Sequence, residues 1–330
     1  MFLSDNVLLS VKNLKTYFFT PEGTVRAVDG VDFDIKKGET LGLAGESGCG
    51  KTTTAYSIIR LVPRPGQIVD GELSFEGENI LKKTEKEMVK MRGNRISMIF
   101  QEPIAAMNPV YTVGSQIIEA IKICHKGISK EEARDKMINL LKLTRVNNPE
   151  LIIDKHPHEL DPGSVQRAMI AIALCGNPPL LLADEPTTTM DVTTEAQIIE
   201  LLKDMKREFN ISILYITHNL GVIARMADRV AIMYAGKIVE LGSIQNVFGD
   251  AKHPYTKGLL SAFPRHDQDI DELYSIPGVV PNLLSPFTMC RFYPRCQFAE
   301  DKICWREEPE LIEVEPGHWV RCYLYGENVE

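Results

Sequence analysis

The spacing of apolar and polar positions predicts a chain that alternates between short buried strands and amphipathic helices. Short apolar runs predict strands at residues 7–11, 27–35, 40–44, 71–75, 96–100, 180–183 and 211–217, and a hairpin at 230–234 and 237–240. Apolar residues spaced by three and four predict helices at 113–123, 131–143 and 194–208, and a charged helix is expected at 88–95. Strands that alternate with helices in this way predict an α/β fold.

The clearest chemical signal is a glycine-rich stretch between a predicted strand and a predicted helix. Residues 45–52 read Gly-Glu-Ser-Gly-Cys-Gly-Lys-Thr, which fits the phosphate-binding pattern G-x-x-x-x-G-K-[ST]. Glycines let the backbone curl so that successive N–H groups point at an anion. We expect Lys51 to reach the β- and γ-phosphates of ATP and Thr52 to hold Mg²⁺. The other nucleotide contacts expected here are Gly45, Ser47, Gly48, Cys49, Gly50 and Thr53.

Two carboxylates follow the apolar strand at 180–183, namely Asp184 and Glu185. An uninterrupted apolar run of this kind is typical of a strand buried on both faces of a parallel sheet. We expect Asp184 to join the Mg²⁺ ligands and Glu185 to polarise a water for in-line attack on the γ-phosphate. A strand followed by an acidic turn is common by itself, so this prediction depends on the phosphate loop upstream.

Three further side chains are candidates for the nucleotide site. Gln101 follows the strand at 96–100, and its amide oxygen can coordinate Mg²⁺ or a water; a solvated strand end is the alternative. His218 follows the strand at 211–217 and can contact the γ-phosphate and orient Glu185, unless it merely caps a helix. In the aromatic run at 17–19 we expect Phe18, with Tyr17 second, to stack on adenine, while ordinary strand packing remains the alternative.

The composition is that of an ordinary globular protein and argues against several classes. The 330 residues, of which 44% are hydrophobic and 25% charged, suggest one large domain or two. The longest apolar candidate, residues 168–183, is interrupted by Asn177-Pro178-Pro179, so we expect no membrane span. The first residues lack the features of a signal peptide, which predicts a cytoplasmic chain. The formal charge of −8 argues against binding to nucleic acid.

The order and spacing of the phosphate loop, Gln101, Asp184-Glu185, Asp191 and His218 resemble those of an ABC-transporter ATPase subunit over residues 7–245. Residues 253–260, 276–278 and 290–296 look like the C-terminal extension of oligopeptide/dipeptide importer ATPases, specifically D-type subunits with a His-Pro-Tyr motif. The resemblance implies an ABC-cassette P-loop NTPase: a RecA-like core, an antiparallel β subdomain and a helical subdomain at about 104–170. It also implies a nucleotide-binding domain at 1–250 and a Cys-rich extension at 251–330.

The resemblance further implies a function, namely an ATP-hydrolysing subunit that powers peptide import by nucleotide-driven dimer closure at the cytoplasmic face of the membrane. The implied partners are a second ATPase subunit, expected to be a different chain, two transmembrane permeases and an extracytoplasmic peptide-binding protein. The implied roles are Q-loop for Gln101, Walker B and catalytic base for Asp184 and Glu185, D-loop for Asp191, and switch histidine for His218. A regulatory subunit that only holds ATP, a nickel importer ATPase and a soluble ABC ATPase are the alternatives.

One segment departs from the family pattern. Where the family has Leu-Ser-Gly-Gly, this chain has Leu160-Asp161-Pro162-Gly163-Ser164. In the family, N–H groups of this segment contact the γ-phosphate bound by the opposite subunit; the Asp161 carboxylate would repel it, and Pro162 has no N–H. Asp followed by Pro is a favourable helix start, so we expect a helix cap without a phosphate role. With an intact, different partner, one ATP site would hydrolyse and the other would mostly hold nucleotide.

Four of the seven cysteines lie in the last 41 residues, in the spacing C-x5-C-x7-C-x17-C. This region is rich in proline and lacks periodicity, so a metal centre would help to order it. The spacing lacks the C-x2-C pairs usual for structural zinc and suits a [4Fe–4S] cluster, to which the resemblance also points. We therefore expect such a cluster, with zinc or no metal as alternatives, at Cys290, Cys296, Cys304 and Cys322.

Overall fold

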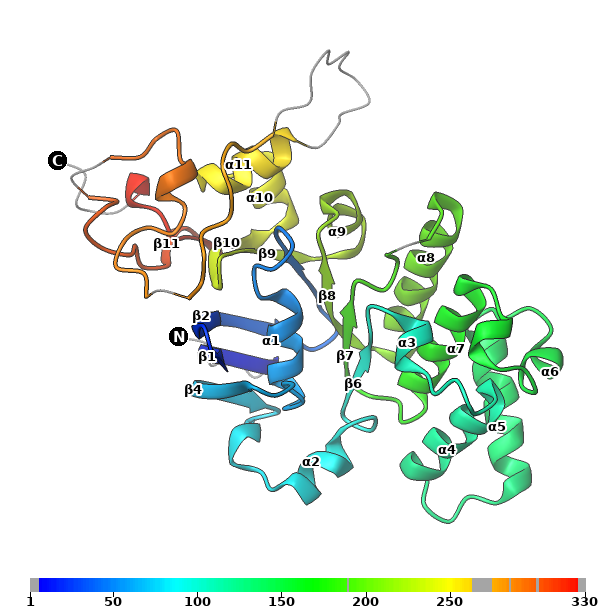
Figure 1. Ribbon diagram of the computed structural model, residues 1–330. Coiled ribbons are helices and arrows are strands. Elements are labelled where there is room, and N and C mark those ends of the chain that lie inside the picture. Colours follow the sequence, from blue (N-terminus) through cyan, green and yellow to red (C-terminus); the bar gives the residue numbers. More distant parts are fainter. Residues whose placement is uncertain (1–5, 189, 263–274, 285, 301–302, 326–330) are drawn as a thin grey trace. The chain divides into compact units, whose positions relative to one another are not determined.

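The computed structural model describes residues 6–188, 190–262, 275–284, 286–300 and 303–325 (Figure 1). The chain divides into two compact units. The first comprises Met1–Ile35, Thr40–Leu81 and Ile216–Glu330, and the second comprises Lys36–Glu39 and Lys82–Tyr215. Both units contain strands and helices, as the predicted α/β class requires.

The first unit begins with an antiparallel sheet in the order β2-β1-β4-β5. Its strands are β1 (Val7–Thr20), β2 (Gly23–Lys36), β4 (Gly66–Phe75) and β5 (Glu78–Asn79), followed by the 3₁₀ turn η1 (Ile80–Lys82). In β1, Leu9 lies opposite Phe75 and Phe18 lies opposite Gly66. β1 is longer than predicted, because its pairing with β4 continues to Phe18 in the aromatic run, where the burial pattern no longer alternates strictly.

A second sheet in this unit joins strands from distant parts of the sequence. β3 (Thr40–Ala44) runs parallel to β9 (Arg229–Tyr234), and β9 pairs antiparallel with β10 (Lys237–Ser243). The antiparallel strands β12 (His318–Val320) and β11 (Ile312–Glu315) follow beyond β10. All five β3 residues are buried, which explains the apolar run. The helices of this unit are α1 (Lys51–Ile58), α9 (Leu220–Met226), α10 (Ile244–Gly249) and α11 (Pro254–Ser261).

The second unit is mostly helical from residue 103 to 174, as predicted. Its parallel strands β6 (Ile96–Ile99) and β7 (Leu180–Asp184) pair with Ile99 opposite Ala183, and β8 (Ser212–Thr217) begins in this unit. The charged helix lies earlier than predicted, because Thr84 and Glu87 form a capping box that begins it at Glu85. Its helices are α2 (Glu85–Met91), α3 (Pro103–Ala106), α4 (Val113–Cys124), α5 (Lys130–Leu143), α6 (Pro149–Ile152), η2 (Pro157–Glu159), α7 (Pro162–Leu174) and α8 (Val192–Phe209).

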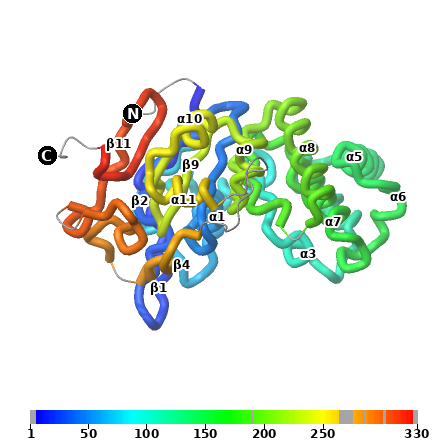
Figure 2. The backbone as a smooth tube through the Cα atoms, turned by 90° about the horizontal axis from the view of Figure 1, so that it is seen from above, coloured from blue at the N-terminus to red at the C-terminus, as the bar shows by residue number. Residues whose placement is uncertain are grey.

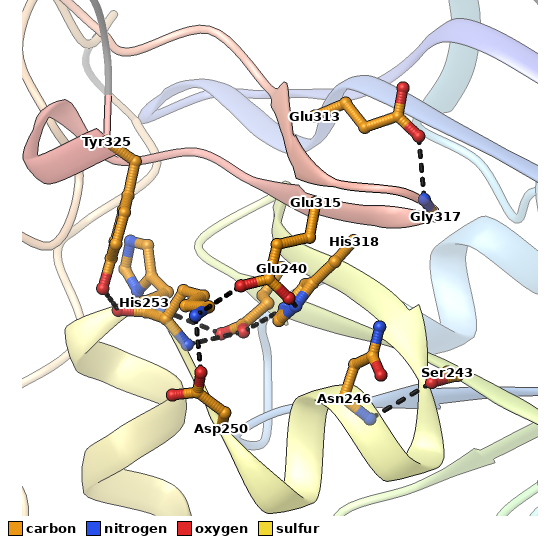
Figure 3. A network of polar contacts seen from close by, with 11 residues as sticks. Glu240, Ser243, Asn246, Asp250, His253, Glu313, Glu315, Gly317, His318 and Tyr325 are labelled. Atoms are coloured by element: carbon orange, nitrogen blue, oxygen red, sulfur yellow. Dashed lines mark hydrogen bonds and ion pairs between the residues drawn. The ribbon is translucent and has the colours of Figure 1, made fainter.

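The C-terminal region, meaning the described residues from 251 to 325, belongs to the first unit and meets β10 around one buried carboxylate (Figure 3). Glu240 on β10 accepts hydrogen bonds from Nε2 of His318, at 2.7 Å, and from the backbone N–H groups of Lys252 and His253, at 2.7 and 3.0 Å. The side chains of Glu240 and His318 are fully buried. The region contains α11 and the turns η3 (Tyr293–Arg295) and η4 (Tyr323–Tyr325), and Figure 2 shows it beside α10.

Within the described ranges, no helix combines the length and apolar character needed to cross a membrane. The predicted domain boundary at residue 250 stays a prediction. The two compact units do not divide the chain at this residue, since the first unit includes both the C-terminal region and the amino-terminal strands.

Candidate functional site

The glycine-rich loop joins a buried strand to a helix, as the sequence predicts. β3 ends at Ala44 and α1 begins at Lys51 (Figure 1). The Lys51 ammonium group donates hydrogen bonds to the carbonyls of Gly45 and Glu46, both at 2.8 Å. Lys51 is buried, so its charge is held over the backbone of the loop. An ammonium group in this position can exchange these carbonyls for phosphate oxygens.

Two glycines of the loop are required by close backbone packing. A Cβ on Gly45 would lie 2.1 Å from the carbonyl oxygen of Met233, and a Cβ on Gly50 would lie 2.2 Å from that of Ala27. The φ angle of Gly50 is +109°, in the region that favours glycine. Thr52 and Thr53 follow in the first turn of α1, where N–H groups without intrahelical acceptors and the helix dipole favour an anion. These residues fit the phosphates of a nucleotide.

The other loop residues differ in exposure. Ser47 and Gly48 are exposed, whereas Cys49 is buried with its Sγ 3.7 Å from the Lys51 ammonium group. Burial raises the pKa of the Cys49 thiol, and the nearby Lys51 only partly offsets this effect. Cys49 is therefore a neutral packing residue, and the backbone around it, rather than its side chain, suits a phosphate.

In the second unit, the structure brings Gln101 and Glu185, two predicted site residues, together at the end of the β6–β7 pair. Asp184 is the last residue of β7 and is 1% exposed. The next residue, Glu185, has a φ of +44°, which is uncommon for a residue with a side chain and often marks a functional site. One Glu185 carboxylate oxygen accepts hydrogen bonds from Nε2 of Gln101, at 3.0 Å, and from the hydroxyl of Thr188, at 2.9 Å.

This arrangement fits the chemistry predicted for Gln101 and Glu185. The Gln101 amide group and the Thr188 hydroxyl orient the Glu185 carboxylate. Because Gln101 donates through Nε2, its amide oxygen points away from this carboxylate. Amide and carboxylate oxygens, such as those of Gln101 and Asp184, are ligands that Mg²⁺ accepts. Sequence reasoning missed Thr188. The polar turn after Glu185 was the only signal that could have pointed to it.

His218 and Phe18 lie in the first unit. His218 follows β8 and is exposed. Phe18 packs against Gly66, since a Cβ there would lie 2.7 Å from the phenyl ring. The hydroxyl of Tyr17 donates to Asp29 at 2.5 Å, and burial together with this carboxylate raises the pKa of Tyr17 to about 12. The nucleotide roles of His218 and Phe18 stay predictions.

Asp161 begins α7, as the sequence predicts. Its carboxylate accepts hydrogen bonds from the N–H of Ser164, at 2.9 Å, and from the Ser164 hydroxyl, at 2.5 Å. Partial burial disfavours the charged carboxylate, but the bonds from Ser164 outweigh burial and hold the pKa of Asp161 below its usual value. Asp191 caps α8 in the same way, with the N–H groups of Thr193 and Thr194. The first amides of α7 are therefore partly used within the helix itself.

The predicted [4Fe–4S] cluster is wrong. Among the residues that the structure describes, no group of three or more His, Cys, Asp or Glu side chains could hold a metal ion. The four cysteines do line one shared cavity, together with aromatic side chains such as Phe292 and Tyr293. Burial raises the pKa of Cys290 to about 12 and that of Cys322 to about 11, which disfavours the thiolates that ligation requires.

Comparisons with known proteins identify the family of this chain. The family model described as "ABC transporter" matches residues 28–188, and the model described as "Oligopeptide/dipeptide transporter, C-terminal region" matches residues 239–304. Over 98% of its length the chain is 49% identical to the oligopeptide transport ATP-binding protein AppD of Bacillus subtilis (strain 168), of which it covers 98%. Over 98% of its length it is also 43% identical to the dipeptide transport ATP-binding protein DppD of Lactococcus lactis subsp. cremoris (strain MG1363), of which it covers 92%. Neither name mentions an iron–sulfur cluster.

A solved structure supports the fold. The dimeric post-hydrolysis state of the ATP-binding cassette MJ0796, bound to ADP and Pi, matches with a TM-score of 0.66 at 27% identity. The match covers 72% of this chain and 99% of that chain. The predicted ABC-cassette fold and the family resemblance are both confirmed. The chain belongs to the oligopeptide and dipeptide transport ATP-binding proteins of the ABC-transporter family.

Proposed function

We propose that this chain is the ATP-binding and ATP-hydrolysing subunit of a transporter that imports oligopeptides or dipeptides. One observation carries the proposal: the loop from Gly45 to Gly50 has the backbone packing of a phosphate site, with Lys51 held over it. The match of residues 239–304 to the oligopeptide/dipeptide C-terminal region, and the names of the relatives, support the peptide substrate class.

The residues divide the reaction between them. Lys51 and the first N–H groups of α1 bind the β- and γ-phosphates of ATP. Glu185, oriented by Gln101 and Thr188, polarises the attacking water, and His218 contacts the γ-phosphate. Thr52, Asp184 and Gln101 would hold Mg²⁺, which would supply positive charge beside the phosphate oxygens.

The partners follow from the family. We infer that a second ATPase subunit and two membrane permeases bind this chain at the cytoplasmic face of the membrane, and that a peptide-binding protein on the other side supplies peptide. ATP binding closes the ATPase dimer, and the helical segment at about 104–160 passes the motion to a permease. Co-purification of the tagged chain with two permeases from detergent-solubilised membranes supports this assembly. Recovery of the chain only in the soluble fraction, without permeases, contradicts it.

We also propose that the two ATP sites of the assembled transporter are unequal. The Asp161 carboxylate already binds the Ser164 N–H and hydroxyl, and Pro162 has no N–H, so this segment has few donors for a phosphate on the partner. Its negative charge also opposes a phosphate. The site that uses this chain's Lys51 and Glu185 is the hydrolysing one, provided that the partner's corresponding segment is intact.

Restoring the family residues here is expected to activate the second site. In the assembled transporter, the double variant Asp161→Ser with Pro162→Gly should raise ATP turnover by about twofold, because a second site would then hydrolyse ATP. Loss of a hydrogen-bond donor of this kind lowers a reaction rate by large factors, so restoring it should activate the site. Pro162→Ala, which restores an N–H but keeps the carboxylate, is the matched comparison and should raise turnover less than the double variant. Phosphate release at saturating ATP measures both. An unchanged or lower turnover in the folded double variant contradicts the asymmetry.

A further inference from the structure

The C-terminal region contacts the phosphate loop directly, at Glu46. The guanidinium group of Arg295 donates two parallel hydrogen bonds to the Glu46 carboxylate, at 2.8 and 3.0 Å. The hydroxyl of Tyr255 accepts the backbone N–H of Glu46 at 3.0 Å. All three residues belong to the first unit. Glu46 is the second residue of the loop, so the region 251–325 is in contact with the segment that should bind ATP.

Glu46 is fixed at three different groups. Its carbonyl accepts a hydrogen bond from the Lys51 ammonium group, while its N–H and its carboxylate are bound by Tyr255 and Arg295. A peptide unit held at the amide, the carbonyl and the side chain cannot rotate without breaking one of these bonds. The two parallel hydrogen bonds between the Arg295 guanidinium group and the Glu46 carboxylate also restrict the orientation of the carboxylate, in addition to its distance.

Arg295 is itself held rigidly. Its Nε donates to the carbonyl of Pro277 at 2.9 Å, and its guanidinium group lies 5.7 Å from the ring centre of Tyr234. Tyr255 packs against Tyr234 and Phe292, with ring centres 4.6 and 5.5 Å away. The Arg295 side chain is only 5% exposed, whereas that of Glu46 is 25% exposed. Arg295 and Tyr255 are therefore held by contacts of their own in addition to their bonds to Glu46.

We propose that Arg295 and Tyr255 are positioning residues for the phosphate loop, so that the C-terminal region is a working part of the ATP site. They hold Glu46 in the orientation that leaves the loop open to a triphosphate, and Arg295 offsets the Glu46 charge close to where that anion binds. This inference rests on the proposed function, because it requires ATP to bind at the loop. It assigns the C-terminal region a role in nucleotide binding that does not involve a metal.

The charge relation makes the proposal testable with a double-mutant cycle. In titrations of the full chain with Mg-ATP, Arg295→Gln should weaken binding by about tenfold, because the uncompensated Glu46 carboxylate repels the phosphates. Arg295→Lys keeps the charge without the paired geometry and should lose less. In a Glu46→Gln background the repelling charge is absent, so Arg295→Gln should change affinity by less than about twofold. In assembled transporters, Arg295→Gln should raise KM for ATP and leave kcat nearly unchanged, since Glu185 is untouched.

Arg321→Gln is the matched control. Arg321 lies in the same region, but its guanidinium group donates to the carbonyls of Ile238 and Pro309 and not to the loop. The Arg321→Gln substitution should lower thermal stability without changing ATP affinity. A tenfold loss in Arg295→Gln that persists in the Glu46→Gln background, or equal losses in Arg295→Gln and Arg321→Gln, would overturn the positioning role. Wild-type protein that does not bind ATP at all would instead overturn the proposed function.

Discussion

Replacing Glu185 by Gln is expected to abolish ATP turnover in the assembled transporter while ATP binding is retained. Gln is nearly isosteric and can still bind Thr188 and Gln101, so the local structure should persist. It has no charge and cannot accept a proton from the attacking water, and loss of such a base costs about 10²–10⁴-fold in rate. Phosphate release should fall by this factor while nucleotide still binds at wild-type affinity.

Glu195→Gln provides the control for this experiment. Glu195 is a glutamate of the same unit that accepts a hydrogen bond from Thr187, at 3.0 Å, and the account gives it no role in catalysis. Turnover should stay near wild type in Glu195→Gln. Full activity in Glu185→Gln would refute the assignment of Glu185 as the base, and equal losses in both variants would point to damage of the fold.

The second large effect is expected at Gly50. In Gly50→Ala the added Cβ would lie 2.2 Å from the carbonyl oxygen of Ala27, at a φ of +109° that alanine rarely adopts. The loop must move to relieve this contact, so we expect ATP binding to weaken by roughly a hundredfold or more. Titration of the folded variant with Mg-ATP measures the loss.

Gly48→Ala separates backbone strain from the steric contact. Gly48 also has a positive φ, +76°, but a Cβ there would meet nothing within 4 Å. This variant should lose much less affinity than Gly50→Ala. If both variants bind ATP like the wild type, the loop does not have the tight packing on which the phosphate site depends.

The sequence was sufficient for features that depend on neighbouring residues. The loop motif is contiguous, and the strands at 40–44 and 180–183 are apolar on both faces, so pattern and structure agree there. The start of α7 at Asp161-Pro162 was also predictable, because capping is decided within one turn. The family resemblance then supplied the roles expected of Gln101, Glu185 and His218.

Contacts between distant segments were not predictable from local pattern. Nothing near Glu46 indicates that Arg295, 249 positions later, binds its carboxylate. The four cysteines do line one cavity, so their proximity was predicted, but the chemistry was not. The sequence shows how many thiols there are and how far apart they lie along the chain. Whether these thiols can ionise and bind a cluster depends on the side chains packed around them, such as Phe292.

An equilibrium titration of the purified full chain with ATP, in the presence and absence of Mg²⁺, tests most directly whether the loop binds a nucleotide. We expect saturation at one nucleotide per chain and tighter binding with Mg²⁺. Binding should be lost when Lys51 is replaced by Ala, since the ammonium group over the loop is then absent. Wild-type protein that fails to bind ATP, or a Lys51→Ala variant that binds it as tightly as the wild type, would show that the loop is not an ATP site.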